Sequence, residues 1–180
     1  STAPLRDRNV ERVTRSPASR RMPHDRSRPS ACRRTPTVAR PLRIAFPGAW
    51  YHVTNRGLER RAIFRAPEDQ TRFLRLLAEG SARFALEVHA YCLMGNHYHL
   101  LVRTPAGNLS EAMRHLDGVY TQRFNRTHGR DGPLFRGRFA SVLVQADRHL
   151  LCAARYIHLN PVEARLAVRP EDWSPSSYRG

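Results

Sequence analysis

Two histidines, His97 and His99, are separated by one residue in a segment with the apolar pattern of a strand. In an extended chain, side chains two residues apart point to the same face, so the two imidazoles project together and Tyr98 points the other way. Neutral imidazole binds divalent metals, and two imidazoles need one more donor and a substrate oxygen to complete a site. The spacing therefore predicts a metal site, and the alternative is two polar side chains on a wet sheet face.

A tyrosine and an asparagine lie one helical turn apart near the C-terminal end. Tyr156 and Asn160 occupy positions i and i+4, so they share a helical face. A phenol is a poor nucleophile at neutral pH unless a metal or a base assists it. Laid against the face of His97 and His99, this helix would supply a nucleophile and a third ligand. Spacing alone does not show that they meet, and Tyr156 could instead pack in the core with the apolar residues of its helix.

Two other residues could take part in the same chemistry. Tyr120 also lies in a helical pattern, but Leu116 and Phe124 at helical spacing indicate that its face is buried, which favours Tyr156 as the nucleophile. His52 lies on the first expected strand and could lie near the metal. A structural role in the sheet is the favoured interpretation of His52.

The apolar periodicity predicts seven elements between residues 41 and 180. Strands are expected at residues 44–54, 86–94, 97–104 and 134–144, and helices at residues 67–84, 109–127 and 147–159. Pro67 suits the first turn of the first helix, and Pro161 is expected to end the last one. This succession predicts an α+β fold, a ferredoxin-like sandwich with helices on one face of an antiparallel sheet, plus a C-terminal helix carrying Tyr156.

The charge of the chain indicates a polyanionic partner. All 31 basic residues are arginine, against 15 acidic residues, and the net charge is +16. The guanidinium fork binds phosphate in a bidentate manner, so nucleic acid is the expected partner.

Residues 1–40 contain 11 arginines and 3 acidic residues with few apolar residues, which predicts a disordered arm ahead of a folded domain at residues 41–180. This arm either grips nucleic acid or is a dispensable extension.

Two clusters of arginine in the folded domain are candidates for contacts with DNA. They comprise Arg56, Arg60 and Arg61 after the first strand, and Arg136 and Arg138 in the last. In the second cluster, Phe135 and Phe139 flank the arginines, a mix that suits the phosphates and stacked bases of an unpaired strand. The alternative for each cluster is a solvated surface.

The cysteines and the hydropathy indicate a cytoplasmic protein. The 3 cysteines lie far apart without a Cys-x-x-Cys pair, so neither a disulfide framework nor a zinc ribbon is expected. No apolar run approaches the ~20 residues of a membrane helix, and the N-terminus lacks the apolar core of a secretory signal. We therefore expect a soluble cytosolic protein with no membrane partner.

Four motifs in sequence resemble those of a known family. They are WYHVTNRG at residues 50–57, MGNHYH at 94–99, GPLFRGRF at 132–139 and YIHLNPV at 156–162. In this order they resemble the single-tyrosine HUH transposases, or insertion-sequence-200-like transposases, and within them the branch associated with repetitive extragenic palindromes. The resemblance covers residues 41–180.

The resemblance implies a reaction and roles for individual residues. His97 and His99 would be ligands of Mg²⁺ or Mn²⁺, Asn160 would complete the site, and Tyr156 would attack a DNA phosphate to give a 5′-phosphotyrosine and a free 3′-hydroxyl. The substrate would be single-stranded DNA with hairpins, and relatives include both monomers and homodimers. Two alternatives remain: a DNA- or RNA-hairpin binding protein without catalysis, and a metal-dependent nuclease that uses water.

Overall fold

The structure, a computed structural model, describes residues 45–145 and 147–179. The predicted arm at residues 1–40 lies outside the described residues. Four strands form one sheet: β1 (Ala49–Arg56), β2 (Glu87–Met94), β3 (His97–Thr104) and β4 (Ala140–Val144). Their order is β2-β3-β1-β4, and each neighbouring pair is antiparallel. This topology confirms the predicted ferredoxin-like α+β sandwich.

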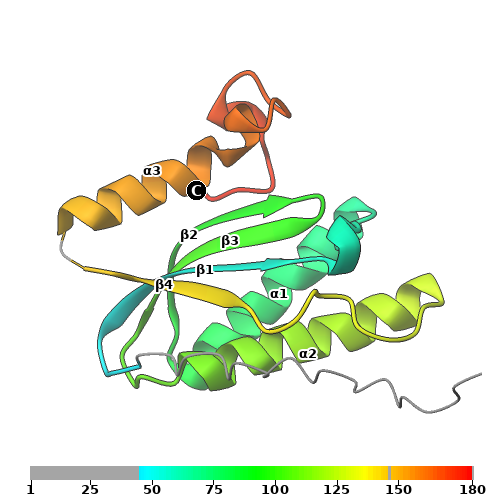
Figure 1. Cartoon of the computed structure of the whole chain (residues 1–180), viewed down its shortest axis with the longest axis horizontal. Helices are drawn as coiled ribbons and strands as arrows, with labels where there is room; N and C mark the ends of the chain where they lie inside the picture. The colour runs from blue at the N-terminus through cyan, green and yellow to red at the C-terminus, as the bar shows by residue number, and fades with distance from the viewer. Residues whose placement is uncertain (1–44, 146, 180) are drawn as a thin grey trace, which may run out of the picture. The chain divides into compact units, whose positions relative to one another are not determined.

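Helices α1 (Pro67–Phe84) and α2 (Leu109–His128) cover one face of the sheet, and α3 (Asp147–Glu163) covers the other (Figure 1). The main core lies between the sheet and the first two helices, with Phe73 of α1 and Met113 of α2 fully buried. A second cluster lies under α3, where Ile157 packs on Cys92 and Leu101. Helices therefore pack on both faces of the sheet.

The start of α1 shows why the sequence predicted it correctly. Pro67 occupies the first turn, and the buried carboxylate of Asp69 accepts hydrogen bonds from the backbone N–H groups of Arg65 (2.9 Å) and Ala66 (3.2 Å). A carboxylate in this position caps the start of the helix, since it pairs the N–H of the N-cap residue Ala66 and of the residue before it. The helix spans the predicted residues 67–84.

Strand β3 divides its side chains between the two faces of the sheet. Tyr98, Leu100 and Val102 belong to the core beneath α1 and α2. By the alternation of a strand, His97 and His99 point to the face covered by α3, together with Leu101 of the second cluster. The predicted bounds of this strand, residues 97–104, are confirmed.

Two strands are shorter or displaced relative to the predictions. β1 begins at Ala49, after the turn at Pro47 and Gly48, and β4 begins only at Ala140. Residues 134–139 cross the end of β1, where the N–H of Arg136 donates to the carbonyl of Arg56 at 2.9 Å. Because Leu134 also leaves the strand pattern to fill the core, this segment is a loop and the predicted strand over residues 134–144 is too long.

The prediction that Pro161 ends the last helix is wrong. α3 includes Pro161 and continues to Glu163, and the N–H of Ala164 donates to the carbonyl of Asn160 at 2.9 Å. Proline lacks an N–H and its ring crowds the carbonyl four residues earlier, which disfavours a helix. The helix nevertheless continues here, because the N–H that follows finds a carbonyl partner. The turn that follows has Arg165 at φ +58°.

The C-terminal segment, residues 173–178, returns to the outer edge of β2. The N–H of Leu93 donates to the carbonyl of Pro175 (2.9 Å), and the indole of Trp173 donates to the carbonyl of Leu93 (3.0 Å). The hydroxyl of Ser177 lies 3.0 Å from Nε2 of His158 on α3. The segment thus ties α3 to the sheet. Among the described helices, none is long and apolar enough to cross a membrane.

Candidate active site

The turn between β2 and β3 is held in place by the loop that follows β1. The N–H of Gly57 donates to the carbonyl of Asn96 (2.9 Å), and the N–H of Ile63 donates to the carbonyl of Gly95 (2.9 Å). A Cβ added at Gly57 would lie 2.1 Å from the carbonyl oxygen of Arg61, so only glycine fits there. This packing fixes the backbone from which His97 projects.

Hydrogen bonds determine which nitrogen of His97 carries its proton. The amide nitrogen of Asn96 donates to the carbonyl of Arg60 at 3.1 Å, so the amide oxygen of Asn96 faces His97. This oxygen lies 2.7 Å from Nδ1 of His97 and can only accept, which makes Nδ1 the protonated nitrogen. Nε2 of His97 therefore keeps its lone pair.

His99 is paired with a third histidine, His52 of β1. Nδ1 of His99 lies 2.9 Å from Nε2 of His52, and the two rings stack with centroids 5.1 Å apart. The buried Nε2 of His99 has no hydrogen-bond partner within the described residues. A protonated Nε2 would be a buried donor without an acceptor, whereas a lone pair at this atom can face a metal ion. The sequence placed His52 in a structural role, but the structure places it against His99.

Burial keeps these imidazoles neutral. Loss of hydration lowers the pKa of His97 to about 4, with a further contribution from the charge of Arg56. Loss of hydration, followed by repulsion from His97, His52 and Arg56, lowers the pKa of His99 to about 3. Burial also lowers the pKa of His52. Only the neutral imidazole has a lone pair for a metal, so both residues have the ligand form at physiological pH.

Tyr156 of α3 lies beside the histidines. Its ring centroid is 5.8 Å from that of His99 and 5.7 Å from that of His52, with edge-on geometry in both cases. Tyr156 remains 45% exposed, so a substrate can approach it. The packing of Ile157 on the second cluster fixes the rotation of α3 that turns Tyr156 toward the histidines. The structure thus places Tyr156 against the histidines, a contact that the sequence could not show.

Asn160 lies one turn after Tyr156, and its amide nitrogen donates to the carbonyl of Tyr156 at 2.9 Å. This bond commits the nitrogen to the helix and leaves the amide oxygen as the atom that could bind a metal. Side-chain amide oxygens are suitable ligands for Mg²⁺ and Mn²⁺. Within the described residues, Asn160 makes no hydrogen bond or ring contact with the histidines.

The two histidines fit a divalent metal whose remaining ligands come from outside this pair. Residues 45–145 and 147–179 contain no group of three or more His, Cys, Asp or Glu side chains that could hold a metal ion. The rings of His97 and His99 lie 5.0 Å apart, and the buried Nε2 of His99 lacks a partner. A closed structural zinc site has four protein ligands, so a metal held by these two imidazoles would have positions open to other ligands.

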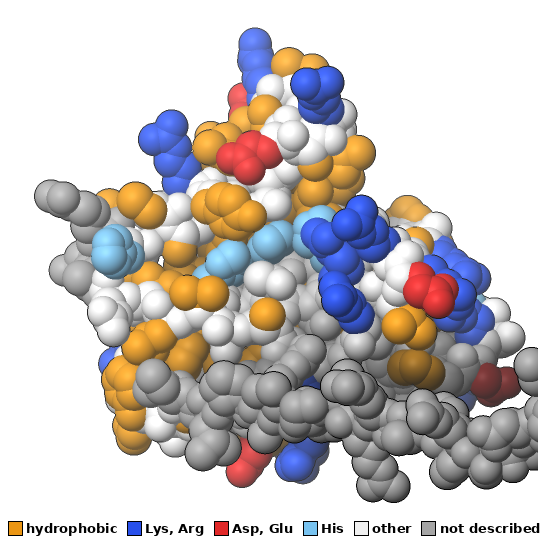
Figure 2. Space-filling model, viewed as in Figure 1, with side chains coloured by type: hydrophobic (Ala, Val, Ile, Leu, Met, Phe, Trp, Pro, Cys, Tyr) orange, Lys and Arg blue, Asp and Glu red, His pale blue; other side chains and the backbone are white. Residues whose placement is uncertain are grey.

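The two predicted arginine clusters meet next to His97. Gly57 and Phe135 form an isolated bridge, and Arg56 pairs with His97 across β1 and β3. All five arginines are exposed: Arg56, Arg60, Arg61, Arg136 and Arg138. We call them the arginine patch. Figure 2 shows histidine side chains in a row across this face, followed by a group of arginines.

The flanking phenylalanines do not belong to this surface. Phe135 and Phe139 are only 6% and 5% exposed and are part of the main core. The prediction that they stack on DNA bases is therefore wrong, because the loop turns both rings inward to anchor the exposed arginines between them.

Tyr120 is excluded as a nucleophile by its surroundings. Its side chain is fully buried, and its hydroxyl donates to the carbonyl of Ile63 at 2.6 Å. Burial raises the pKa of Tyr120 well above its usual value. The sequence-based preference for Tyr156 agrees with this placement.

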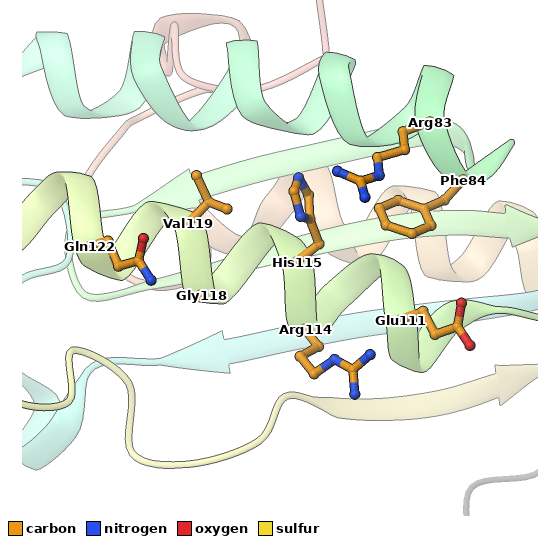
Figure 3. A pocket seen from close by; sticks show the side chains of 8 residues that line it. All are labelled: Arg83, Phe84, Glu111, Arg114, His115, Gly118, Val119 and Gln122. Atoms are coloured by element: carbon orange, nitrogen blue, oxygen red, sulfur yellow. The ribbon is translucent and has the colours of Figure 1, made fainter.

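A separate groove of about 460 Å³ lies between α1 and α2. Figure 3 shows Arg83 and Phe84 on α1 facing His115 on α2. The Phe84 and His115 rings are 5.4 Å apart. Because α1 and α2 cover the sheet face opposite α3, this groove is separate from the histidines.

Comparisons with known proteins identify relatives of the chain. The family model described as "Transposase IS200 like" matches residues 45–160. A protein of Haemophilus influenzae described as a REP-associated tyrosine transposase is 27% identical over 106 residues. The match covers 53% of this chain and 60% of that relative, so the chain spans less than two thirds of its length.

A solved structure shares the fold. It is a REP-associated tyrosine transposase bound to a REP hairpin, with a TM-score of 0.66 and 17% identity. The superposition covers 78% of this chain and 83% of that chain. At this identity the similarity establishes the fold alone.

Proposed function

Because the chain belongs to the IS200-like transposase family, we propose that it is a metal-dependent transposase that cleaves and rejoins single-stranded DNA at hairpins. The observation that carries the proposal is the position of Tyr156, an exposed phenol whose ring lies against His99 and His52. The solved relative was bound to a REP hairpin, which supports a DNA hairpin as the partner of this chain.

In the proposed reaction, Oη of Tyr156 attacks the phosphorus of a phosphodiester. The bond from phosphorus to O3′ breaks, the phenol loses its proton, and O3′ takes up one proton and leaves as a 3′-hydroxyl. The 5′ end remains on the protein as a phosphotyrosine. Each step exchanges one phosphate ester for another, so attack by a 3′-hydroxyl restores a DNA strand and frees the phenol without ATP.

The residues that would hold the metal are His97 and His99 through Nε2, with the amide oxygen of Asn160 as a third candidate. The chemistry that Mg²⁺ or Mn²⁺ supplies when bound here is polarisation of the phosphate oxygens and stabilisation of the leaving O3′. The arginine patch lies beside His97 and would bind the phosphates that flank the cleavage site, since exposed guanidinium groups favour a polyanion.

Covalent trapping tests the function. We would incubate the protein and Mg²⁺ with single-stranded oligonucleotides that carry one fixed stem-loop and randomised flanks. A 3′ label should remain attached to the denatured protein, whereas a 5′ label should appear on a free fragment with an extendable 3′-hydroxyl. Cleavage without a protein-linked label would indicate a nuclease that uses water, and binding without cleavage would indicate a hairpin-binding protein.

His52 should control the affinity of the metal site through its hydrogen bond to His99. His52→Phe keeps an aromatic ring against Tyr156 but removes the acceptor for Nδ1 of His99, and outer hydrogen bonds of this kind change metal affinity by about 10–100-fold. We therefore expect weaker Mn²⁺ binding in calorimetry or electron paramagnetic resonance titrations. His52→Gln, which can place a polar atom near Nε2, should retain most of the affinity. Equal Mn²⁺ affinity in the Phe variant would contradict this role.

A further inference from the structure

A polar pair lies directly beneath the histidines on the opposite face of the sheet. Asn55 of β1 and Tyr98 of β3 are partners in the antiparallel register, and their neighbours Arg56 and His97 are the next pair. Tyr98 is fully buried and Asn55 is 5% exposed. Tyr98 separates the two predicted ligands, so a shift of its backbone moves both imidazoles.

One carboxylate of α2, that of Asp117, accepts hydrogen bonds from both members of this pair. The hydroxyl of Tyr98 donates to Oδ1 of Asp117 at 2.8 Å, and the amide nitrogen of Asn55 donates to Oδ2 at 2.8 Å. Hydrogen bonds to an ionised acceptor are stronger than neutral ones. Asp117 therefore fixes β1 and β3 at the level of the histidines.

The same network reaches the loop that carries part of the arginine patch. The amide nitrogen of Asn55 also lies 3.3 Å from the carbonyl oxygen of Gly137, between Arg136 and Arg138. The amide oxygen of Asn55 accepts the N–H of Arg56 at 2.9 Å. Asn55 thus links the carboxylate to both halves of the arginine patch.

We propose that Asp117 is a positioning residue that holds the histidine pair through Tyr98 and the loop at residues 134–139 through Asn55. The inference rests on the proposed function, because it assigns Asp117 to the alignment of the metal site with the DNA-binding arginines. It acts through these two residues and does not touch the substrate.

Three variants separate the hydrogen bond from Tyr98 to Asp117 from the one that Asn55 makes to Asp117. Asp117→Asn has one oxygen and one amino group, so it can accept from Tyr98 or from Asn55 but not from both. We expect Mn²⁺ affinity to fall about tenfold, together with weaker binding of a labelled hairpin in fluorescence anisotropy. Tyr98→Phe removes only the hydrogen bond from β3 to Asp117, so Mn²⁺ affinity should fall while hairpin affinity is retained.

The third variant exchanges the two groups. In Asn55→Asp combined with Asp117→Asn, the amide at position 117 can donate to the carboxylate at 55 and still accept from Tyr98. The new carboxylate can also accept the N–H of Arg56, but it faces the carbonyl oxygen of Gly137 and repels it. We expect Mn²⁺ affinity to return to the wild-type value and hairpin affinity to remain low.

The matched control is Thr121→Val. The hydroxyl of Thr121 donates to the backbone carbonyl of Asp117 at 2.7 Å, so this variant removes a hydrogen bond of the same residue without affecting the carboxylate. Both affinities should be those of the wild type, after thermal unfolding has shown that the variants are folded at the temperature of measurement.

Unchanged Mn²⁺ affinity in both Asp117→Asn and Tyr98→Phe would overturn the proposal. So would an exchange variant that fails to recover Mn²⁺ affinity although it is folded. These titrations do not depend on strand transfer. A wild-type protein that binds Mn²⁺ and hairpin DNA but forms no covalent adduct would refute the proposed reaction, and the affinities would still decide the role of Asp117.

Discussion

Tyr156→Phe is expected to abolish the covalent DNA adduct. The substitution removes only the hydroxyl and preserves the ring that contacts His99 and His52, so the fold and the metal site should remain intact. Loss of a nucleophile typically lowers the rate by several orders of magnitude, and we expect at least about a thousandfold less protein-linked 3′ label. Hairpin affinity measured by anisotropy should not change, because the arginine patch is untouched.

Tyr120→Phe is the matched control for this experiment. It removes a phenolic hydroxyl from a helix on the other face of the sheet, where the group donates to the carbonyl of Ile63. The variant should lose some stability and keep its adduct. If Tyr156→Phe still formed the adduct, or if Tyr120→Phe alone lost it, the assignment of the nucleophile would be wrong.

Replacing either predicted metal ligand by asparagine should eliminate detectable metal binding at low concentration. Asparagine keeps a polar group near Nδ1, and hence the contact with Asn96 or His52, but it lacks an equivalent of Nε2. Since loss of a direct ligand should exceed the 10–100-fold effect of outer hydrogen bonds, we expect His97→Asn and His99→Asn to weaken Mn²⁺ binding by at least about a hundredfold. Adduct formation should fall with it.

His115→Asn provides the control, because this residue lies in the groove between α1 and α2 on the opposite side of the sheet (Figure 3). Its Mn²⁺ affinity and adduct yield should match those of the wild type. Wild-type affinity in both His97→Asn and His99→Asn would show that the metal does not bind at this pair.

Local patterns in the sequence predicted much of the fold. Residues 97–104 alternate with the period of a strand, and Pro67 marks the start of α1, so the bounds of both elements could be assigned. The orientation of His97 and His99 toward one face follows from the same alternation. These features depend on short-range geometry, which can be inferred directly from the order of residues.

Features that depend on tertiary packing could not be obtained in this way. The contact of Tyr156 with His99 requires α3 to pack on the face opposite α1 and α2, and His52 becomes relevant only because β1 pairs with β3. The aromatic residues beside Arg136 and Arg138 look like a stacking surface in sequence, but the crossing of the loop over β1 buries them. Pro161 illustrates the opposite case, in which packing and later hydrogen bonds extend a helix past a residue that disfavours it.

The segment at residues 173–178 has a consequence for how the protein behaves in concentrated solution. An unpaired outer strand invites other chains to add themselves to a sheet, and proteins that leave it bare tend to aggregate. Here the backbone of Tyr91 and Leu93 is already engaged by Ser177 and Pro175. The chain thus supplies its own cover for that margin of the sheet, whereas β4 forms the opposite margin among the described strands.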